Sequence, residues 1–352
     1  MAASALRAGL RRLHSGRLQP PVVELGASDA ARRLRRACGP DGPGFFHLPM
    51  SSEAAAAADR ALQLSRELFA MSAEDKARLG NVEAHFYRYR GLRIPASGPG
   101  YRAPGGDANF RSDGRESFNV GRDVEGDPRA PYGPTPWPGE ERLPGFRRAC
   151  ELYASLALQA SCDLRRCIAE ALDLDRNFFE DPSFFDRAPW LLGMVCYLPV
   201  ASDPARGRFG IAPHQDDGIF TLLHTDGLPG LQFCPSWGGS NLHREQAMRD
   251  PSLEWLDVQP MPGHWLVNLG TLLSRWSHGR LRATLHRVTF GEGSGHRHSL
   301  PFFYEANLDA PVRCLPGCRA WRAGLPPPPP DTTPGDILLE LARRDGLALH
   351  EV

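Results

Sequence analysis

The chain has 352 residues, 41% of them hydrophobic, which is enough to bury the core of one large domain or two ordinary ones. Lysine and arginine together number 41, as do aspartate and glutamate, so no overall positive charge favours nucleic acid as a partner. No apolar run reaches the length of a membrane span. The eight cysteines form no CxxC pair and are expected to be reduced thiols rather than zinc ligands. The 36 glycines and 33 prolines favour a turn-rich protein over a helical bundle.

Residues 1–20 carry arginines among leucines and precede the first acidic side chain, Glu24. The leucines recur at helical spacing, so a helix there would have one apolar and one basic face, which is typical of an organellar transit peptide. The alternative is an untargeted, disordered tail. The first interpretation predicts a mitochondrial or plastid location and the second a cytoplasmic one. A fusion of residues 1–25 to a fluorescent reporter distinguishes them.

Residues 21–180 are expected to form a largely helical N-terminal region that packs on the core. The apolar positions of its last helix, including Phe146, Leu152 and Leu156, recur at helical intervals. In chain order, the signals predict a strand at 21–25, a helix at 30–38, a strand at 44–48, a helix from Ser51 or Ser52 to about Leu79, extended loops over 80–135 with one strand at 116–120, and a long helix from about Glu140 to Leu172.

From Trp190 onward the pattern changes to short apolar or alternating segments separated by Gly, Pro and Asp. Many short strands with turn signals between them predict a mainly β fold of the sandwich or jelly-roll type, with flanking helices. We place this core at 181–312, with an inserted loop at 235–252. The segment 313–352 is expected to hold a proline-rich stretch and a short helix at about 335–344. The strands are expected at 190–198, 219–224, 230–234, 253–258, 264–269, 283–290 and 297–304.

A candidate metal site lies in the segment Pro213-His214-Gln215-Asp216-Asp217-Gly218. On a strand, His214 and Asp216 would share one face and Asp217 would point to the other. A later strand-like run contains His286, which can lie beside the first pair. Two histidines and one carboxylate form the facial triad of non-haem Fe(II) oxygenases, which leaves open positions for a bidentate 2-oxo acid and O₂.

A second constellation is Arg297-His298-Ser299. Arg297 and Ser299 also share a strand face, and a guanidinium with a hydroxyl suits a buried carboxylate. The two constellations reinforce each other, because a metal can chelate the keto-acid end of a molecule whose far carboxylate the arginine holds.

These motifs resemble those of the isopenicillin-N-synthase-like family of 2-oxoglutarate/Fe(II)-dependent dioxygenases, over most of residues 20–310. One departure is Val195, where family members often have asparagine. The matching segments are His214-Gln-Asp216, Phe220-Thr-Leu-Leu223, Gly230-Leu-Gln-Phe233, Val267-Asn-Leu-Gly270, Leu285-His286-Arg287-Val288, Arg297-His-Ser299, Tyr197-Leu-Pro199, Pro21 to Leu25 and Gly44-Phe-Phe46.

The resemblance implies a double-stranded β-helix core, which is a distorted jelly roll. It implies that His214, Asp216 and His286 bind Fe(II), and that Arg297 and Ser299 bind 2-oxoglutarate, with help from the Tyr197 hydroxyl. It also implies that the cosubstrate is converted with O₂ to succinate and CO₂ while a small molecule is hydroxylated or desaturated. Ascorbate would serve as a reductant. We expect a monomer with no nucleic-acid or membrane partner.

The substrate is expected to approach beside the iron, past aromatic and basic residues of the N-terminal half. The candidates for contact with an anionic or planar substrate are Arg88, Arg102, Phe118, Asn119 and Phe303. The alternative for the arginines is a solvated loop without a specific role.

Two other functions stay open at this point. One is a non-catalytic module of the same fold that senses 2-oxoglutarate or iron, and the other is an Fe(II) oxidase of the same fold that does not use 2-oxoglutarate. The intact triad together with the intact Arg297 and Ser299 pair favours the dioxygenase.

Overall fold

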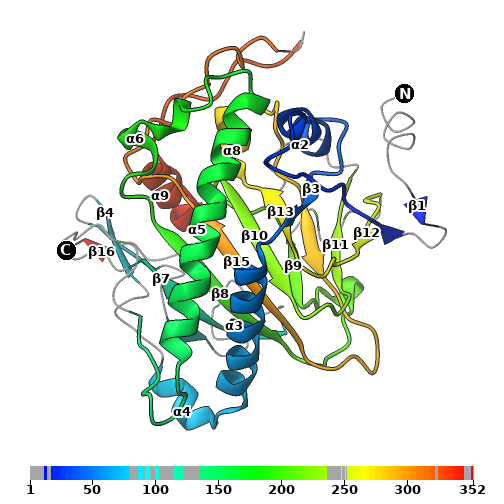
Figure 1. Ribbon diagram of the computed structural model, residues 1–352, viewed down its shortest axis with the longest axis vertical. Helices are drawn as coiled ribbons and strands as arrows, with labels where there is room; N and C mark the ends of the chain where they lie inside the picture. Colours follow the sequence, from blue (N-terminus) through cyan, green and yellow to red (C-terminus); the bar gives the residue numbers. More distant parts are fainter. Residues whose placement is uncertain are drawn as a thin grey trace.

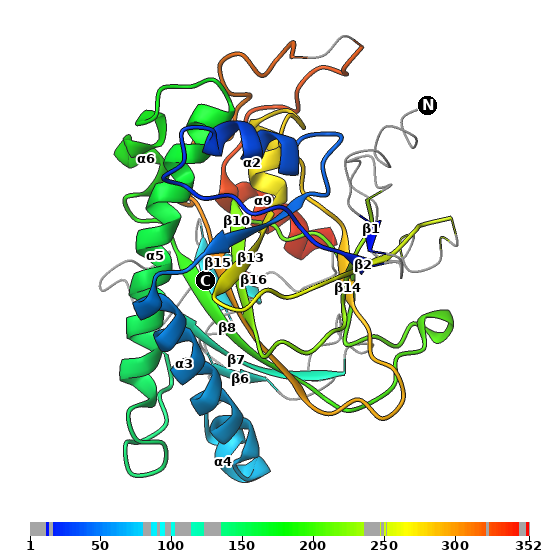
Figure 2. The ribbon, with the colours of Figure 1, turned by 45° about the vertical axis from the view of Figure 1, so that its right-hand side comes forward.

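The computed structural model describes residues 12–13, 17–79, 86–89, 92–95, 100–102, 114–122, 135–235, 247, 250, 252–321, 324–344 and 350–351. Two sheets face each other, and helices cover the outer face of the larger one (Figure 1, Figure 2). This arrangement is a jelly roll, so the prediction of a mainly β fold with flanking helices is confirmed. No helix in the described part of the chain is long and apolar enough to cross a membrane.

The larger sheet holds seven strands and the smaller one six. In spatial order the larger sheet consists of β3 (Phe45–Pro49), β13 (His264–Leu269), β10 (Phe220–Thr225), β15 (Arg297–Tyr304), β8 (Trp190–Tyr197), β7 (Arg115–Gly121) and β6 (Gly100–Arg102). The smaller sheet consists of β1 (Arg12–Leu13), β2 (Arg17–Leu18), β12 (Leu256–Val258), β11 (Leu231–Phe233), β14 (His286–Val288) and β9 (Ile211–His214). A separate three-stranded sheet holds β16 (His350–Glu351), β5 (Leu92–Pro95) and β4 (Phe86–Tyr89).

The larger sheet has a buried core on each face, because alternate side chains of a strand point in opposite directions. Phe302 and Tyr304 of β15 belong to the core beneath the helices, where the Tyr304 hydroxyl accepts a hydrogen bond from Arg165 at 3.0 Å. Tyr197 of β8 and Leu266 of β13 belong to the core between the two sheets. The inner face of the larger sheet is therefore the face that can line a site.

Helices α3 and α5 lie side by side across the outer face of the larger sheet (Figure 1, Figure 2). Trp265 of β13 anchors this layer, because its indole N–H donates to the Tyr153 hydroxyl of α5 at 3.0 Å and both residues are buried. The helices are α2 (Ala30–Cys38), α3 (Ser52–Ala70), α4 (Ala73–Arg78), α5 (Phe146–Ala171), α6 (Pro182–Phe185), α8 (Thr271–Trp276) and α9 (Pro334–Arg344), with 3₁₀ turns η3 (Phe178–Glu180) and η4 (Pro204–Arg206).

Two predicted helix boundaries are wrong. The helix expected from Ser51 or Ser52 to about Leu79 ends at Ala70, because Met71 is extended and the Ser72 hydroxyl caps a new helix, α4. The helix expected from about Glu140 begins at Phe146, since a Pro-Gly pair precedes it and Gly145 has a φ of +72°. Ser51 caps α3 as predicted.

The N-terminal region differs from expectation at three more places. The strand expected at 21–25 is reduced to a single bridge between Val22 and His47. The residues 80–135 contain β4, β5 and β6 besides the predicted strand, which is β7. The helix expected within residues 1–20 lies mostly outside the described residues. Where those residues are described, Arg12–Leu13 is a strand. Most of the inserted loop at 235–252 also lies outside them.

Gly44 stands where β3 approaches the segment before β14. Its φ is +81°, and a Cβ atom there would overlap the Thr284 hydroxyl, two residues before His286. We expect Gly44→Ala to lose about 1–3 kcal/mol of stability from strain and overpacking. Thermal unfolding measures this, with Gly207→Ala as the control, because Gly207 has a φ of +71° and no atom within 4 Å. An equal loss in both variants would show that the overlap contributes nothing.

Candidate active site

The three candidate metal ligands converge between the sheets. His214 ends β9 and His286 begins β14, and the two residues are direct cross-strand partners with ring centroids 4.2 Å apart. Each Nε2 lies 3.6 Å from Oδ1 of Asp216. The ligand atoms of all three residues lie within 4.8 Å of one another, which is close enough to share one ion.

Asp216 reaches the site for a different reason than strand alternation. The strand ends at His214, so Asp216 lies in the turn that follows it. This turn docks on the start of α8, where the Thr271 N–H donates to the Asp216 carbonyl at 2.8 Å. The Asp216 side chain is 8% exposed, whereas Asp217 is exposed. Asp216 rather than Asp217 is the carboxylate that lies beside the two imidazoles, but the predicted strand geometry at this point is wrong.

Hydrogen bonds orient both imidazoles toward the common centre. Nδ1 of His214 lies 2.9 Å from the Ala212 carbonyl, and Nδ1 of His286 lies 3.0 Å from the Thr284 carbonyl. A carbonyl accepts only, so each Nδ1 carries the proton in these contacts. Each Nε2 then presents its lone pair to an ion, which is the arrangement that metal-binding histidines show in proteins.

The carboxylate of Asp216 is held in the same way. Its Oδ2 accepts hydrogen bonds from the Thr221 hydroxyl at 2.5 Å and from the Asn268 amide at 2.7 Å, so Oδ1 faces the two imidazoles. Burial opposes ionisation, but His286, His214 and the two hydrogen bonds together lower the pKa of Asp216. The side chain is therefore kept as a carboxylate suited to a cation.

Thr221→Val tests this support without touching a ligand. We expect Fe(II) affinity to fall about 10–100-fold, the usual cost of losing a hydrogen bond to a metal ligand. An anaerobic Fe(II) titration measures the affinity, and Thr221→Ser should restore most of it because the hydroxyl is kept. Wild-type affinity in Thr221→Val would show that the hydrogen bond does not position Asp216.

Arg297 and Ser299 form a buried polar pair on the inner face of β15. Arg297 is 3% exposed and Ser299 is 1% exposed. Arg297 Nε donates to the Leu228 carbonyl at 3.2 Å, and the guanidinium lies 5.0 Å from the ring centroid of Tyr197, its cross-strand partner on β8. Within the described part of the chain, Arg297 Nη1 and Ser299 Oγ have no hydrogen-bond partner. Buried polar atoms are rarely left so, and both suit a carboxylate.

Tyr197 contacts its neighbours in the site through its aromatic ring. Its ring packs against the Arg297 guanidinium and lies 5.5 Å from Phe290. This contact orients the guanidinium. The predicted contact of the Tyr197 hydroxyl with the cosubstrate stays a prediction.

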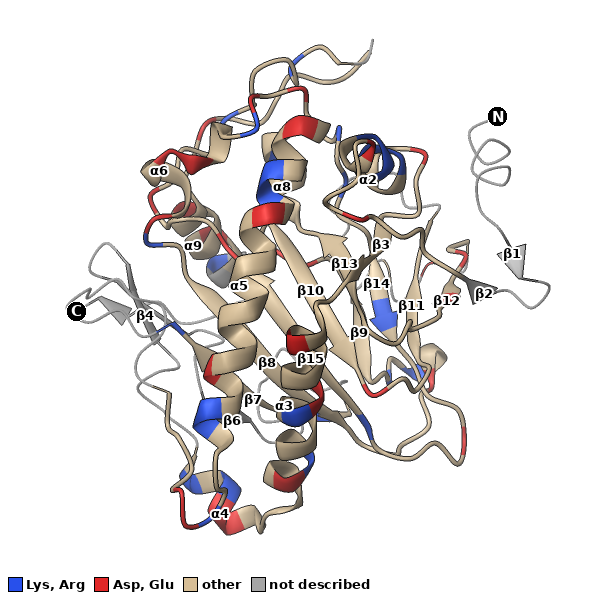
Figure 3. Cartoon of the chain, in the orientation of Figure 1, with Lys and Arg blue, Asp and Glu red and all other residues tan. Residues whose placement is uncertain are grey.

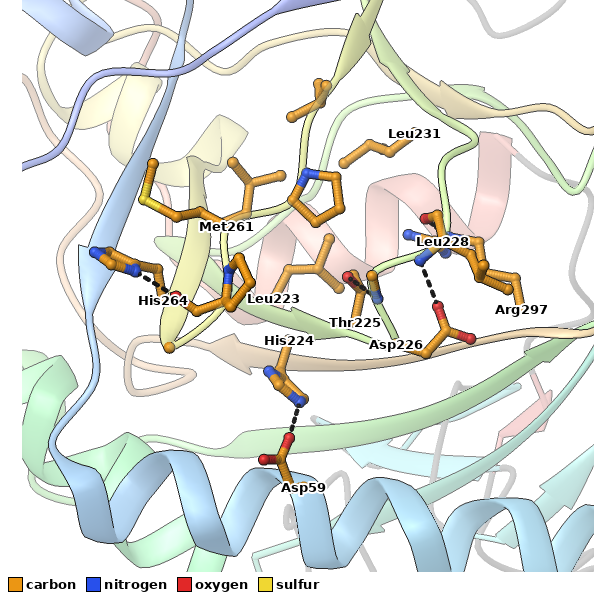
Figure 4. A pocket seen from close by; sticks show the side chains of 16 residues that line it. Asp59, Leu223, His224, Thr225, Asp226, Leu228, Leu231, Met261, His264 and Arg297 are labelled. Atoms are coloured by element: carbon orange, nitrogen blue, oxygen red, sulfur yellow. Dashed lines mark hydrogen bonds and ion pairs between the residues drawn. The ribbon is translucent and has the colours of Figure 1, made fainter.

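A cavity of about 290 Å³ opens between the sheets, with Arg297 in its wall (Figure 4). Leu223, Leu231 and Leu266 supply apolar surface, which suits the methylene chain of a small dicarboxylic acid. The described lining residues include none of the three candidate ligands. On the helix side the cavity reaches His224, whose Nε2 lies 3.3 Å from Oδ1 of Asp59 on α3.

The predicted substrate residues divide into three groups. Asn119 and Phe303 bracket Gly193, where a Cβ atom would lie 3.5 Å from Asn119 Oδ1 and 3.6 Å from Phe303 Cε2. Phe118 faces the other way and packs 5.7 Å from Phe146 in the helix-side core, so its assignment to the pocket is wrong. Arg88 lies on β4 and Arg102 on β6, but their side chains fall outside the described residues.

Sequence reasoning missed three residues of the site. Thr221 and Asn268 belong to motifs singled out above, and their roles toward Asp216 depend on strand pairing across β10 and β13. Glu305 follows β15 and had no motif to mark it. Burial, followed by the charges of Asp217 and Asp216, raises the pKa of Glu305 to about 8.

The fold and site together define a non-haem metal oxygenase. Residues 190–306 match the 2OG-Fe(II) oxygenase superfamily, and residues 20–140 match the family described as non-haem dioxygenase in morphine synthesis N-terminal. Azadirone synthase of Melia azedarach is 31% identical over 296 residues, which cover 82% of this chain and 81% of that protein. A 2-oxoglutarate-Fe(II) type oxidoreductase of Aspergillus fumigatus is 28% identical over 343 residues, with 92% of each chain covered. The chain belongs to the 2-oxoglutarate/Fe(II)-dependent dioxygenases.

Solved structures agree on the fold. A full-length Neurospora crassa protein, solved in complex with α-ketoglutarate and thymine, superposes with a TM-score of 0.73 at 22% identity, covering 95% of this chain and 99% of that one. JOX2, solved with 2-oxoglutarate, iron and JA, gives a TM-score of 0.70 at 21% identity, with 97% and 93% covered. The protein is therefore an oxidoreductase whose cofactors are Fe(II), 2-oxoglutarate and O₂, as predicted.

Proposed function

We propose that His214, Asp216 and His286 hold Fe(II), and that Arg297 and Ser299 hold the far carboxylate of 2-oxoglutarate, in an enzyme that hydroxylates or desaturates a small molecule. The observation that carries this proposal is the pair of unpartnered buried atoms on Arg297 and Ser299, in the same inter-sheet space as the triad. When bound, Fe(II) supplies the redox chemistry by which O₂ and 2-oxoglutarate yield succinate, CO₂ and the oxidised substrate.

The chain's own residues bind the ion and the cosubstrate, orient the cosubstrate and exclude water. Three protein ligands leave open positions on a six-coordinate ion for a chelating keto acid and O₂. Arg297 fixes the far end of the dicarboxylate, so its keto-acid end is directed toward the triad. The apolar walls of the cavity, such as Leu223 and Leu266, keep bulk water away from the reacting atoms.

Succinate release is the direct test. Purified protein is supplied with Fe(II), ascorbate, 2-oxoglutarate and O₂, with and without a panel of small molecules, and both succinate and O₂ are measured. We expect succinate to accumulate and to increase with a true substrate. Bound 2-oxoglutarate without any turnover would favour the sensing module, and O₂ consumption without succinate would favour the Fe(II) oxidase.

We propose further that the enzyme is a monomer without a nucleic-acid partner. Equal numbers of acidic and basic residues support the second part, and both charges are interspersed over the helices (Figure 3). Light scattering coupled to gel filtration measures the mass in solution. A dimer mass would contradict the monomeric state. Salt-dependent retention on duplex or single-stranded DNA would contradict the absence of a nucleic-acid partner.

A further inference from the structure

Glu305 lies close to the proposed iron centre. Arg297, Ser299 and Phe303 occupy alternate positions of β15 on its inner face, and Glu305 follows directly after the strand ends at Tyr304. Both of its carboxyl oxygens lie against Gly218, at 2.5 and 2.6 Å from where a Cβ atom would stand. The carboxyl group is therefore next to the turn that carries Asp216.

The backbone leaves room for this carboxyl group because residue 218 is a glycine. Any side chain at Gly218 would overlap Glu305. On its other side the turn is closed, because the Gly218 carbonyl packs against Gly270, where a Cβ atom would also overlap. Glu305 is partly exposed, so a small molecule can reach its carboxyl group beside this turn.

Glu305 differs from other glutamates with low exposure in having no partner. Glu116 pairs with Lys76 at 2.7 Å, and Glu170 pairs with Arg176 at 3.0 Å. Among the residues that the structure describes, none forms a hydrogen bond or ion pair with the Glu305 carboxyl group, and the charged groups that act on it are Asp217 and Asp216. A carboxyl group of low exposure without a hydrogen-bond or ion-pair partner is unusual, since such groups are normally paired.

We propose that Glu305 determines specificity by binding a basic nitrogen of the substrate, in an amine, amidine or guanidine. This rests on the proposed function, which places the substrate beside the triad. A substrate cation would supply the missing partner of the Glu305 carboxyl group and would favour its ionised form. A substrate carboxylate or phosphate at this place would lie beside the Glu305 and Asp217 side chains, neither of which can pair with an anion, so we expect it to bind less well.

The test uses pairs of compounds that differ in charge and little else. Alkylamines are compared with the corresponding alcohols, and alkylguanidines with the corresponding ureas, as stimulators of succinate release by the full-length enzyme with Fe(II) and 2-oxoglutarate. We expect the cations to stimulate and the neutral isosteres to act at least about tenfold less well in kcat/KM. In Glu305→Gln, the KM for the cation should rise at least about tenfold, so that the preference within each pair approaches one.

The matched control is Glu292→Gln, an exposed glutamate that should keep the wild-type preference. Equal stimulation by cations and neutral isosteres in the wild type, or an unchanged preference in Glu305→Gln, would overturn the inference. Failure of the proposed function gives a different result, because wild-type protein would then release no succinate with any compound or without one.

Discussion

Replacing His286 with alanine should lower Fe(II)-dependent succinate release by more than about a hundredfold, because loss of a ligand exceeds the 10–100-fold cost of losing a residue that only supports one. His286 is one of two imidazoles whose Nε2 lies 3.6 Å from Asp216 Oδ1, and its Nδ1 is already committed to the Thr284 carbonyl. The variant leaves one imidazole and one carboxylate, which cannot fix the ion on one face of its coordination sphere.

The control is His296→Ala, an exposed histidine ten positions further along the chain. It should bind iron and release succinate as the wild type does. Iron content after anaerobic loading is measured beside activity, and circular dichroism checks the fold of both variants. Full iron content and activity in His286→Ala would remove His286 from the metal site.

Replacing Arg297 with methionine should raise the KM for 2-oxoglutarate by about a hundredfold or more, while Fe(II) affinity stays close to that of the wild type. Methionine keeps much of the buried apolar contact with Tyr197 but removes the charge and the fork of donors. Truncating one partner of a buried, hydrogen-bonded charge pair costs about 2–5 kcal/mol, which corresponds to a factor of this size.

A second cosubstrate makes this prediction specific. 2-Oxopentanoate has the same keto-acid end as 2-oxoglutarate but lacks the far carboxylate. The wild type should strongly prefer 2-oxoglutarate, and Arg297→Met should lose most of that preference, which completes a cycle between the residue and the carboxylate. Arg313→Met, at an exposed arginine, is the control. An undiminished preference in Arg297→Met would show that another group binds the far carboxylate.

The strands of the core and the identity of the candidate site residues were predictable because their signals are local. Short apolar or alternating runs between turn residues mark β8, β10, β13 and β15, and a serine at the right spacing marks the start of α3. The helix breaks at Ser72 and Gly145 were missed, although both also have local causes. In those places capping and glycine conformation outweighed an apolar pattern that continues through them.

Asp216 shows the limit of local reasoning most clearly. Alternation along a strand led to the right carboxylate by a wrong route, because β9 ends two residues earlier and the docking of the turn on α8 places the side chain. Phe118 and Asn119 show the same limit. Their opposite directions follow from alternation, but which of the two faces the space between the sheets depends on which side of the sheet the helices cover.

By itself, the sequence determined the fold class, the order of the strands along the chain and the set of side chains able to bind iron and a dicarboxylate, because residue type and spacing carry these directly. The tertiary structure alone decided that His214 faces His286 across two strands, that Thr221 and Asn268 hold Asp216, and that Glu305 lies against Gly218. The physical reason is that register and packing between distant segments are set by the burial of whole faces, and no stretch of the chain contains that information on its own.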